Sequence, residues 1–174
     1  MKKVLIFIIA LIAGILIFSF AIGKHNPVKD GQVGVVVGPD GKYKIYQAGE
    51  RPFVIPLVQK LYAVSLQKQD FIISGKDGYM LSDDGRNILV ESRVIYKISD
   101  LDRAINTFGP VETHEKIRDR IRQLLTPLLQ EKIKDISYLD SAQKRIPAIA
   151  EIHLGLNDSF SKQGISILSY QLRY

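Results

Sequence analysis

The pattern of hydrophobic positions divides this chain of 174 residues into parts that follow different rules. An uncharged and mostly apolar run occupies residues 4–23, and alternation of apolar and polar positions is common in residues 32–98. Apolar positions three or four apart dominate residues 101–160, before a final strand-like run at 165–174. Period-two alternation is typical of half-buried strands, whereas a period near 3.6 is typical of amphipathic helices. The order predicts a hydrophobic leader, then strands, then helices, then one strand.

The leading run, Val4 to Gly23, contains twenty residues without a formal charge and directly follows Lys2 and Lys3. A helix rises about 1.5 Å per residue, so the run spans roughly 30 Å, the thickness of a bilayer's hydrocarbon core. A helix also satisfies its own backbone hydrogen bonds in lipid, so we expect one transmembrane helix here. The side chains that define this membrane anchor are Val4, Leu5, Ile6, Phe7, Leu11, Leu16, Phe18, Phe20 and Ile22.

A cleaved secretory signal is the alternative interpretation of the same residues. The basic start, the apolar centre and the small residues within Ser19-Phe20-Ala21 are features of such signals. The length of the run favours a retained anchor, because Phe18, Phe20 and Ile22 continue it through the candidate cleavage site. A short basic start before a long apolar run favours a cytoplasmic N-terminus, with the domain on the other side of the membrane.

Strands are predicted in the first half of the remaining chain. Residues 32–37 and 42–46 flank Gly38-Pro39-Asp40-Gly41, a strong turn signal, and so predict a hairpin. Further strands are expected within residues 60–74 and 87–98. The candidates for inward-facing side chains in the last of these are Ile88, Val90, Val94, Tyr96 and Ile98.

Three helices are predicted in the second half. Asp100 is a suitable N-cap for a short helix that ends at Gly109-Pro110. The next helix is the most strongly patterned, although Pro127 should kink or restart it, with Thr126 as a cap. Its apolar stripe consists of Ile117, Ile121, Leu124, Leu125, Leu128, Leu129 and Ile133.

The third helix is expected over residues 141–162, and Gly164 is well placed to end it. Its apolar stripe consists of Ile146, Ile149, Ile152, Leu156 and Phe160. Strands followed by helices and a single strand predict an α+β fold. We expect a twisted, mostly antiparallel sheet with the helices packed on one side.

Composition argues against an enzyme. The chain has no Cys, which excludes disulfides, thiol catalysis and Cys-based zinc sites. His25, His114 and His153 have no partners at metal-ligand spacing, and His153 is expected to be a hydrogen-bonded boundary residue. No phosphate loop or nucleophile motif is present. We therefore predict no catalytic residue, no metal and no cofactor.

Charge gives little guidance to partners, with one exception. Without Lys2 and Lys3, the 24 basic residues fall to 22 against 18 acidic ones, a mild net charge of +4. Such a charge suits an anionic membrane surface, and no basic cluster suggests nucleic acid. The second helix carries Arg118, Asp119 and Arg122 beside its apolar stripe. These form either a solvated face or a polar contact between subunits.

Several short pieces in a shared order resemble a known family. They are Val28-Lys29-Asp30-Gly31-Gln32-Val33-Gly34-Val35-Val36, Tyr46-Gln47-Ala48-Gly49, Phe53-Val54-Ile55-Pro56, Asp84-Gly85, Val94-Ile95-Tyr96-Lys97-Ile98 with Ser99-Asp100, the helix of Arg118 and Arg122, and Gly164-Ile165-Ser166-Ile167. The chain resembles the SPFH or band-7 domain of stomatins, prohibitins, flotillins and the bacterial HflK and HflC proteins. The short basic start and single anchor are most similar to the HflC and prohibitin branch.

The resemblance implies an SPFH domain over residues 28–174, strand-rich to residue 98 and helical with a final strand from residue 99. It implies a non-catalytic scaffold in the bacterial inner membrane that self-associates or joins related SPFH subunits. Such a scaffold would organise a membrane patch and modulate a membrane protease of the AAA type. The long coiled coil that usually follows is not in this sequence, so we do not expect full cage assembly.

The same resemblance implies that one apolar segment lies near the bilayer. Its candidate membrane-proximal residues are Phe53, Val54, Ile55, Leu57 and Val58. Burial of these side chains in the domain core is an equally good interpretation. The rival function for the whole chain is a secreted or periplasmic monomeric binding domain, released by cleavage of its leader.

Overall fold

The computed structural model describes residues 9, 14, 27–55, 57–74, 79–81, 87–132 and 142–173. The chain forms two compact units, Met1–Ser65 and Leu66–Tyr174. Within the described residues no helix has the length and apolar character needed to cross a bilayer. Of the predicted anchor only Ile9 and Gly14 are described, both helical, and the rest lies outside these ranges.

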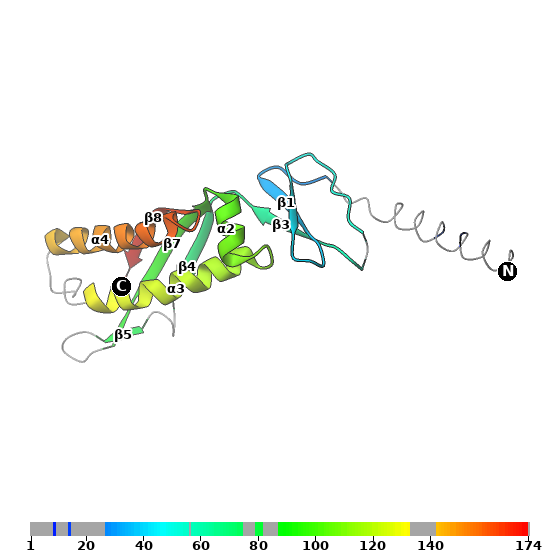
Figure 1. Ribbon diagram of the computed structural model, residues 1–174. Coiled ribbons are helices and arrows are strands. Elements are labelled where there is room, and N and C mark those ends of the chain that lie inside the picture. The colour runs from blue at the N-terminus through cyan, green and yellow to red at the C-terminus, as the bar shows by residue number, and fades with distance from the viewer. Residues whose placement is uncertain are drawn as a thin grey trace. The chain divides into compact units, whose positions relative to one another are not determined.

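The first unit contains a small antiparallel sheet. Its strands are β1 (Gln32–Val37), β2 (Tyr43–Tyr46) and β3 (Lys60–Ser65), in the order β2-β1-β3 (Figure 1). The predicted hairpin is confirmed, because Val37 pairs with Tyr43 across the turn. Gly38 N–H donates to Lys42 O at 2.8 Å to close that turn, and Gly41 takes a φ of +77° that suits glycine.

The centre of this sheet is β1. Its valines Val33, Val35 and Val36 are buried, so both faces of the strand are covered. Gly34 allows a close approach, since a Cβ there would lie 2.9 Å from the Val28 side chain and 3.2 Å from that of Leu61. The core of the unit therefore depends on small and β-branched residues.

The second unit is built on another antiparallel sheet. Its strands are β4 (Gln69–Ile73), β7 (Glu91–Ile98) and β8 (Ile165–Arg173), in the order β4-β7-β8, and β5 (Tyr79–Leu81) pairs separately with β6 (Asn87–Leu89). The α+β class and antiparallel pairing are as predicted, but the single sheet is wrong. The stretch 60–74 divides, because β3 pairs with β1 in the first unit whereas β4 pairs with β7 in the second.

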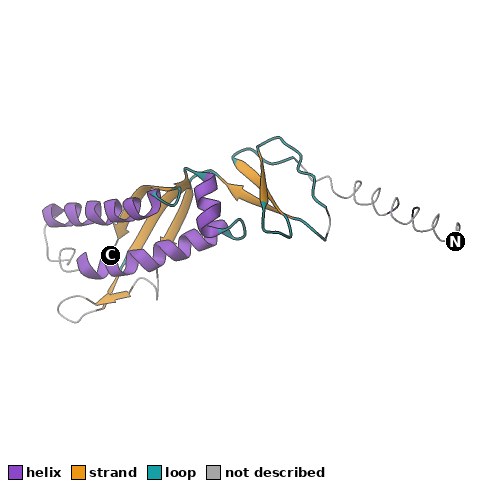
Figure 2. Cartoon of the chain, in the orientation of Figure 1, coloured by secondary structure: helices purple, strands orange, loops and turns teal. Residues whose placement is uncertain are grey.

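Three helices lie on one face of the second sheet: α2 (Leu101–Phe108), α3 (Thr113–Lys132) and α4 (Ala142–Ser161) (Figure 2). Strand β7 shows the consequence, because alternate side chains on it are buried. The predicted inward residues Val90, Val94, Tyr96 and Ile98 are buried, while the side chain of Ile88 lies outside the described residues.

Helix α3 is continuous where the sequence predicts an interruption. Its buried stripe contains Ile117, Ile121, Leu125 and Leu129, as predicted, with Leu124 and Leu128 half-buried and Ile133 outside the described residues. The helix runs through Pro127, and Thr126 is not a cap, because its hydroxyl donates to Arg122 O at 3.0 Å. Burial of Leu125 and Leu129 on either side holds the helix together, since tertiary packing outweighs local propensity.

Helix α4 confirms most of its predicted stripe. Ile152, Leu156 and Phe160 are buried and Ile149 is half-buried, but Ile146 is 67% exposed. Ala148 takes the buried position at that end, because steps of four residues lead from it to Ile152, Leu156 and Phe160. His153 is the expected boundary residue, with its Nε2 3.1 Å from Ile167 O.

The ends of two helices meet closely at Gly164. Asp100 caps α2 by accepting from Arg103 N–H at 3.1 Å, as predicted. The carbonyl of Gly164 accepts the N–H groups of Ser99 and Asp100 at 2.9 and 3.0 Å. Gly164 has a φ of +80°, and a Cβ there would lie 2.3 Å from Asp100 O. Only glycine fits this junction between α4, β8 and α2.

Candidate functional site

The most unusual surface of the first unit is an apolar segment between β2 and β3. Phe53, Ile55, Leu57 and Val58 are exposed, and Leu57 is 106% exposed. Val54 alone of the predicted membrane-proximal residues is buried, at 4% exposure. The core interpretation therefore holds for Val54 and is wrong for the other four. Clustered exposed apolar side chains are unusual for a soluble surface and mark interaction sites.

A tight turn holds the tip of this segment outward. The N–H groups of Val58 and Gln59 donate to Ile55 O at 3.2 and 2.9 Å. In addition, the Oε1 atom of the Gln59 side chain accepts a hydrogen bond from Ile55 N–H at 3.0 Å. Leu57 has a φ of +66°, a left-handed conformation that costs a residue with a Cβ about 1–2 kcal/mol. The fold therefore keeps a strained leucine in full exposure.

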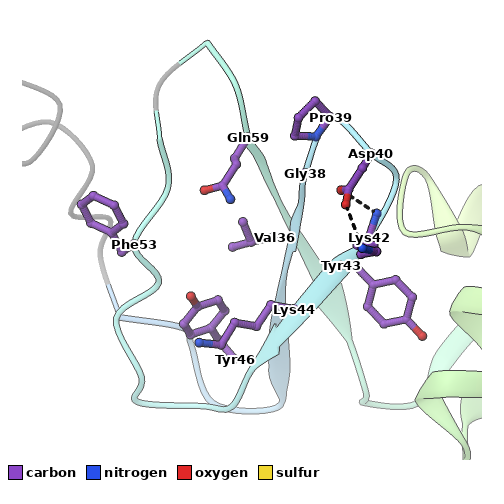
Figure 3. Close-up of a pocket in the computed structure, with 10 residues that line it drawn as sticks. All are labelled: Val36, Gly38, Pro39, Asp40, Lys42, Tyr43, Lys44, Tyr46, Phe53 and Gln59. Carbon is purple, nitrogen blue, oxygen red and sulfur yellow. Dashed lines mark hydrogen bonds and ion pairs between the residues drawn. The ribbon is translucent and has the colours of Figure 1, made fainter. Parts of the chain in front are cut away.

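A pocket of about 480 Å³ lies at the base of the segment (Figure 3). Phe53 and Gln59, at the two ends of the segment, both line it. The other described lining residues come from the β1–β2 hairpin: Val36, Gly38, Pro39, Asp40, Lys42, Tyr43, Lys44 and Tyr46. The pocket and the exposed turn are thus parts of one surface.

The described lining of the pocket contains two lysines and one aspartate, so its charges do not sum to zero. Lys42 Nζ lies 3.4 Å from Asp40 Oδ2, and the backbone N–H of Lys42 donates to Asp40 Oδ1 at 3.2 Å. Lys44 Nζ lies instead 5.1 Å from the centroid of the Tyr46 ring, a cation–π contact. Lys44 therefore determines the net positive charge of the described lining.

The predicted polar residues of α3 lie in the second unit and do not form one exposed patch. Arg122 Nη1 bonds to Asp119 Oδ1 at 3.0 Å, and Asp119 is exposed. The Arg122 guanidinium also lies 5.5 Å from the ring of Phe71 on β4. Arg118 is half-buried, and its Nε and that of Arg122 are both buried. Both arginines thus turn toward their own sheet.

Two further groups of the second unit have shifted ionisation. Burial raises the pKa of Tyr96, against a smaller opposing effect of a hydrogen bond with Arg118. A hydrogen bond from Arg93 lowers the pKa of Asp70, and Arg93 Nε lies 3.0 Å from Asp70 Oδ1. Both pairs belong to the second unit, whereas the exposed turn belongs to the first. Across the described ranges, no three His, Asp or Glu side chains are grouped to hold a metal ion.

The fold and its surface define a two-unit α+β domain whose first unit has a turn suited to contact with an apolar environment. The sequence matches the SPFH domain / Band 7 family over residues 27–174, and the chain belongs to this family. Members are generally non-enzymatic scaffolds and commonly form oligomers. No curated protein matches the chain.

Sequence reasoning found the apolar segment and missed the pocket. The pocket needs residues from three separate stretches, Val36, Lys44 and Phe53 among them, which only strand pairing brings together. One signal was available: Lys42 and Lys44 alternate with Tyr43 along a short strand next to a turn. Side chains two apart on a strand share a face, so a basic face at this place was predictable.

Proposed function

We propose that this chain is a membrane-anchored SPFH scaffold whose first unit rests on the bilayer. The fully exposed Leu57, held outward in a strained turn, is the observation that carries the proposal. The predicted anchor, Val4 to Gly23, would deliver this unit to the membrane surface, because only a few residues separate it from β1.

The energetics of insertion favour this arrangement. Burying a Val, Leu or Ile side chain is worth about 1.5–3 kcal/mol. The exposed side chains of Ile55, Leu57 and Val58 could together contribute several kcal/mol on entering lipid, which exceeds the 1–2 kcal/mol that the Leu57 backbone costs. The anchor removes most of the entropic cost of association, because the turn is already tethered to the surface.

Scaffolding follows from repeated weak contacts between anchored copies. We propose that the chain associates laterally with itself or with related SPFH subunits, with Asp119 at the edge of the contact. Confinement to a membrane raises the effective concentration, so even a weak lateral contact can order many copies. Such an assembly would organise a membrane patch and modulate a membrane AAA protease, with the domain on the non-cytoplasmic face of a bacterial inner membrane.

Depth-dependent quenching tests the position of the turn. The chain has no Trp, so Leu57→Trp introduces a single tryptophan at the tip, whose emission can be excited separately from that of the tyrosines. The full chain is reconstituted in vesicles that contain brominated phosphatidylcholine, and Ala48→Trp, in an exposed turn of the same unit, is the control. We expect strong quenching for Leu57→Trp and weak quenching for Ala48→Trp. Equal quenching of both variants would contradict insertion of the turn.

Fractionation and sizing test the remaining parts. The full-length chain should remain with membranes after carbonate washing, and after detergent extraction should appear by electron microscopy as particles larger than one copy. A soluble, solitary chain would contradict the scaffold.

The pocket favours one second candidate, a secreted or periplasmic monomeric binding domain. In that case the leader is removed and the pocket takes a small ligand from solution. Mass spectrometry of the mature N-terminus separates the two candidates, because loss of Met1 to Ala21 supports the binding domain.

A further inference from the structure

We propose that the pocket between the β1–β2 hairpin and the exposed turn binds the phosphate of an anionic phospholipid headgroup. The inference rests on the proposed function, because it assumes that the turn enters the bilayer. It adds a chemical preference to that contact: the first unit would select lipids with a net negative charge.

Position is the first argument. The apolar segment leaves the pocket at Phe53 and returns to it at Gln59, with Leu57 at the tip between them. When the tip enters the hydrocarbon, its base lies a few ångströms higher, at the depth of the headgroups. Tyr46 suits that depth, since tyrosine side chains gather at the membrane interface.

Charge is the second argument. Asp40 and Lys42 neutralise each other at 3.4 Å, so Lys44 gives the described lining its net positive charge. The Lys44 amino group lies over the Tyr46 ring, 5.1 Å from the ring centroid. A charge-assisted hydrogen bond from an ammonium to a phosphate is about twice as strong as a neutral one.

Hydrogen-bond donors are the third argument. The Gln59 Oε1 atom is already used by Ile55 N–H, which directs its amide nitrogen elsewhere. Figure 3 shows that nitrogen pointing toward Val36, into the pocket. Three residues of the lining, Gln59, Tyr46 and Lys44, therefore carry hydrogen-bond donors: an amide, a hydroxyl and an ammonium group. A phosphate offers the acceptor oxygens that such a set needs.

Size is compatible with this occupant. A hollow of about 480 Å³ lies within the range of small-molecule sites, roughly 300–1,000 Å³. A glycerol phosphate headgroup fits within it, while the acyl chains would continue along Phe53 toward the exposed tip.

The test is native mass spectrometry of the full chain in neutral detergent micelles. Phosphatidylglycerol and phosphatidylcholine are titrated in separate arms, and glycerol 3-phosphate supplies the same phosphate without acyl chains. Lys44→Gln removes the charge in the pocket. Lys60→Gln is the matched control, because Lys60 is exposed in β3 of the same unit and does not line the pocket.

We expect phosphatidylglycerol to bind about tenfold more weakly to Lys44→Gln, and no more than about threefold more weakly to Lys60→Gln. Phosphatidylcholine and glycerol 3-phosphate should bind weakly to all variants. Equal losses in the two variants would show a diffuse electrostatic effect and overturn the proposal. Tight binding of glycerol 3-phosphate would identify a site for free phosphate and overturn the lipid assignment.

The failure of this inference can be distinguished from failure of the proposed function. Lys44→Gln should leave the quenching of Leu57→Trp by brominated lipid unchanged, because the tip inserts through apolar side chains. If quenching persists and Lys44→Gln binds phosphatidylglycerol normally, the turn inserts without headgroup selection and only this inference fails. If quenching is absent in every variant, the proposed function itself fails.

Discussion

The two units of this chain bury apolar side chains by different means. Among the described residues, the first unit buries five hydrophobic side chains, all valines: Val33, Val35, Val36, Val54 and Val64. The second buries eighteen, among them Ile117, Leu156 and Phe160 of its helices. The second unit thus buries one face of its β4-β7-β8 sheet under its own helices α3 and α4.

The first unit is small for an independent fold. A domain of about 40 residues rarely buries enough surface to be stable without a metal, a disulfide or a partner. The chain has no Cys, and the unit exposes Leu57 and Val58 instead of covering them. If the proposed membrane contact is right, the two units divide their roles: the second unit is stable by itself, and the bilayer completes the first.

The sharpest way to test this division is to unfold the second unit alone. Gly164→Ala should do so, because the new Cβ would lie 2.3 Å from Asp100 O and the φ of +80° disfavours alanine. We expect a loss of more than about 3 kcal/mol in the free energy of unfolding. Chemical denaturation monitored by helical circular dichroism measures it.

A glycine of α4 provides the control. Gly155→Ala places a Cβ in ordinary contact with the Leu128 side chain, at 3.7 Å, and should stabilise the helix by about 0.5–1 kcal/mol. Hydrogen exchange should show lost protection in residues 87–132 and 142–173 of Gly164→Ala in membranes, with little change in residues 32–37, 43–46 and 60–65. Parallel loss in both ranges would mean that the units fold as one.

The sequence predicts most of the second unit because its helices have a clear apolar periodicity. The repeat of Ile117, Ile121, Leu125 and Leu129 is long enough to determine the buried face of α3, and Asp100 and Gly164 mark helix ends by their chemistry. The prediction for Ile146 is wrong, because Pro147 and the alternation of Ala148, Ile149 and Ala150 leave the phase of the apolar stripe ambiguous at that end. Packing of Ala148 determines the phase instead.

The first unit was less predictable, for a physical reason. Alternation identifies strands β1 and β2 but carries no information about partners, so the separation of β3 from β4 was not visible. The segment around Leu57 is apolar whether it enters a core or a membrane, and its sequence cannot distinguish the two. The backbone and side-chain hydrogen bonds between Ile55 and Gln59 determine its exposure, and the sequence pattern does not reveal them.

Alkaline pH probes the interior of the second unit. Burial raises the pKa of Tyr170 to about 12, against a smaller opposing effect of its hydrogen bond with Ser92 at 3.2 Å. Tyrosine in the unfolded chain ionises near pH 10. Stability from this group is therefore complete below pH 10 and falls as pH rises toward 12, by about 2–3 kcal/mol in all.

Denaturation of the wild type and of Tyr170→Phe at pH 9, 10 and 11 measures this loss. The variant loses its hydroxyl bond and should start about 1 kcal/mol less stable. Its stability should then fall less steeply than that of the wild type, since it lacks the Tyr170 hydroxyl that resists ionisation in the folded chain. Identical slopes would contradict the assignment to Tyr170.

A substitution in the strained turn of the first unit should raise stability and weaken contact with the bilayer. Leu57→Gly relieves the φ of +66° and should stabilise the isolated protein in detergent by about 1 kcal/mol. It also removes the most exposed apolar side chain of the described residues, so contact with the bilayer should weaken. Leu57→Ala is the control, because it removes most of the apolar area and keeps the strain. Crosslinking to photoreactive acyl chains should fall for both variants, while only Leu57→Gly gains stability.

The smallest expected effect concerns the edge of α3. Asp119 is 65% exposed in its side chain and bonds to Arg122 at 3.0 Å, and an exposed i, i+3 pair contributes about 0.2–0.5 kcal/mol. Asp119→Asn should therefore leave the free energy of unfolding within about 0.5 kcal/mol of the wild type. Asp158→Asn, exposed on α4, makes the same change in charge elsewhere on the second unit.

The two substitutions separate a lateral contact from an ordinary solvated face. If Asp119 lies at the contact between copies, Asp119→Asn should shift chemically crosslinked species in membranes toward single copies while Asp158→Asn does not. High salt should also shift the crosslinked species of the wild type toward single copies. Exposed charges are screened beyond about 8–10 Å at physiological ionic strength, and more strongly at high salt. Unchanged crosslinking in Asp119→Asn would leave Asp119 in a solvated face and require another surface for assembly. The self-contained second unit would then supply stability alone, and the incomplete first unit would carry both membrane contact and association.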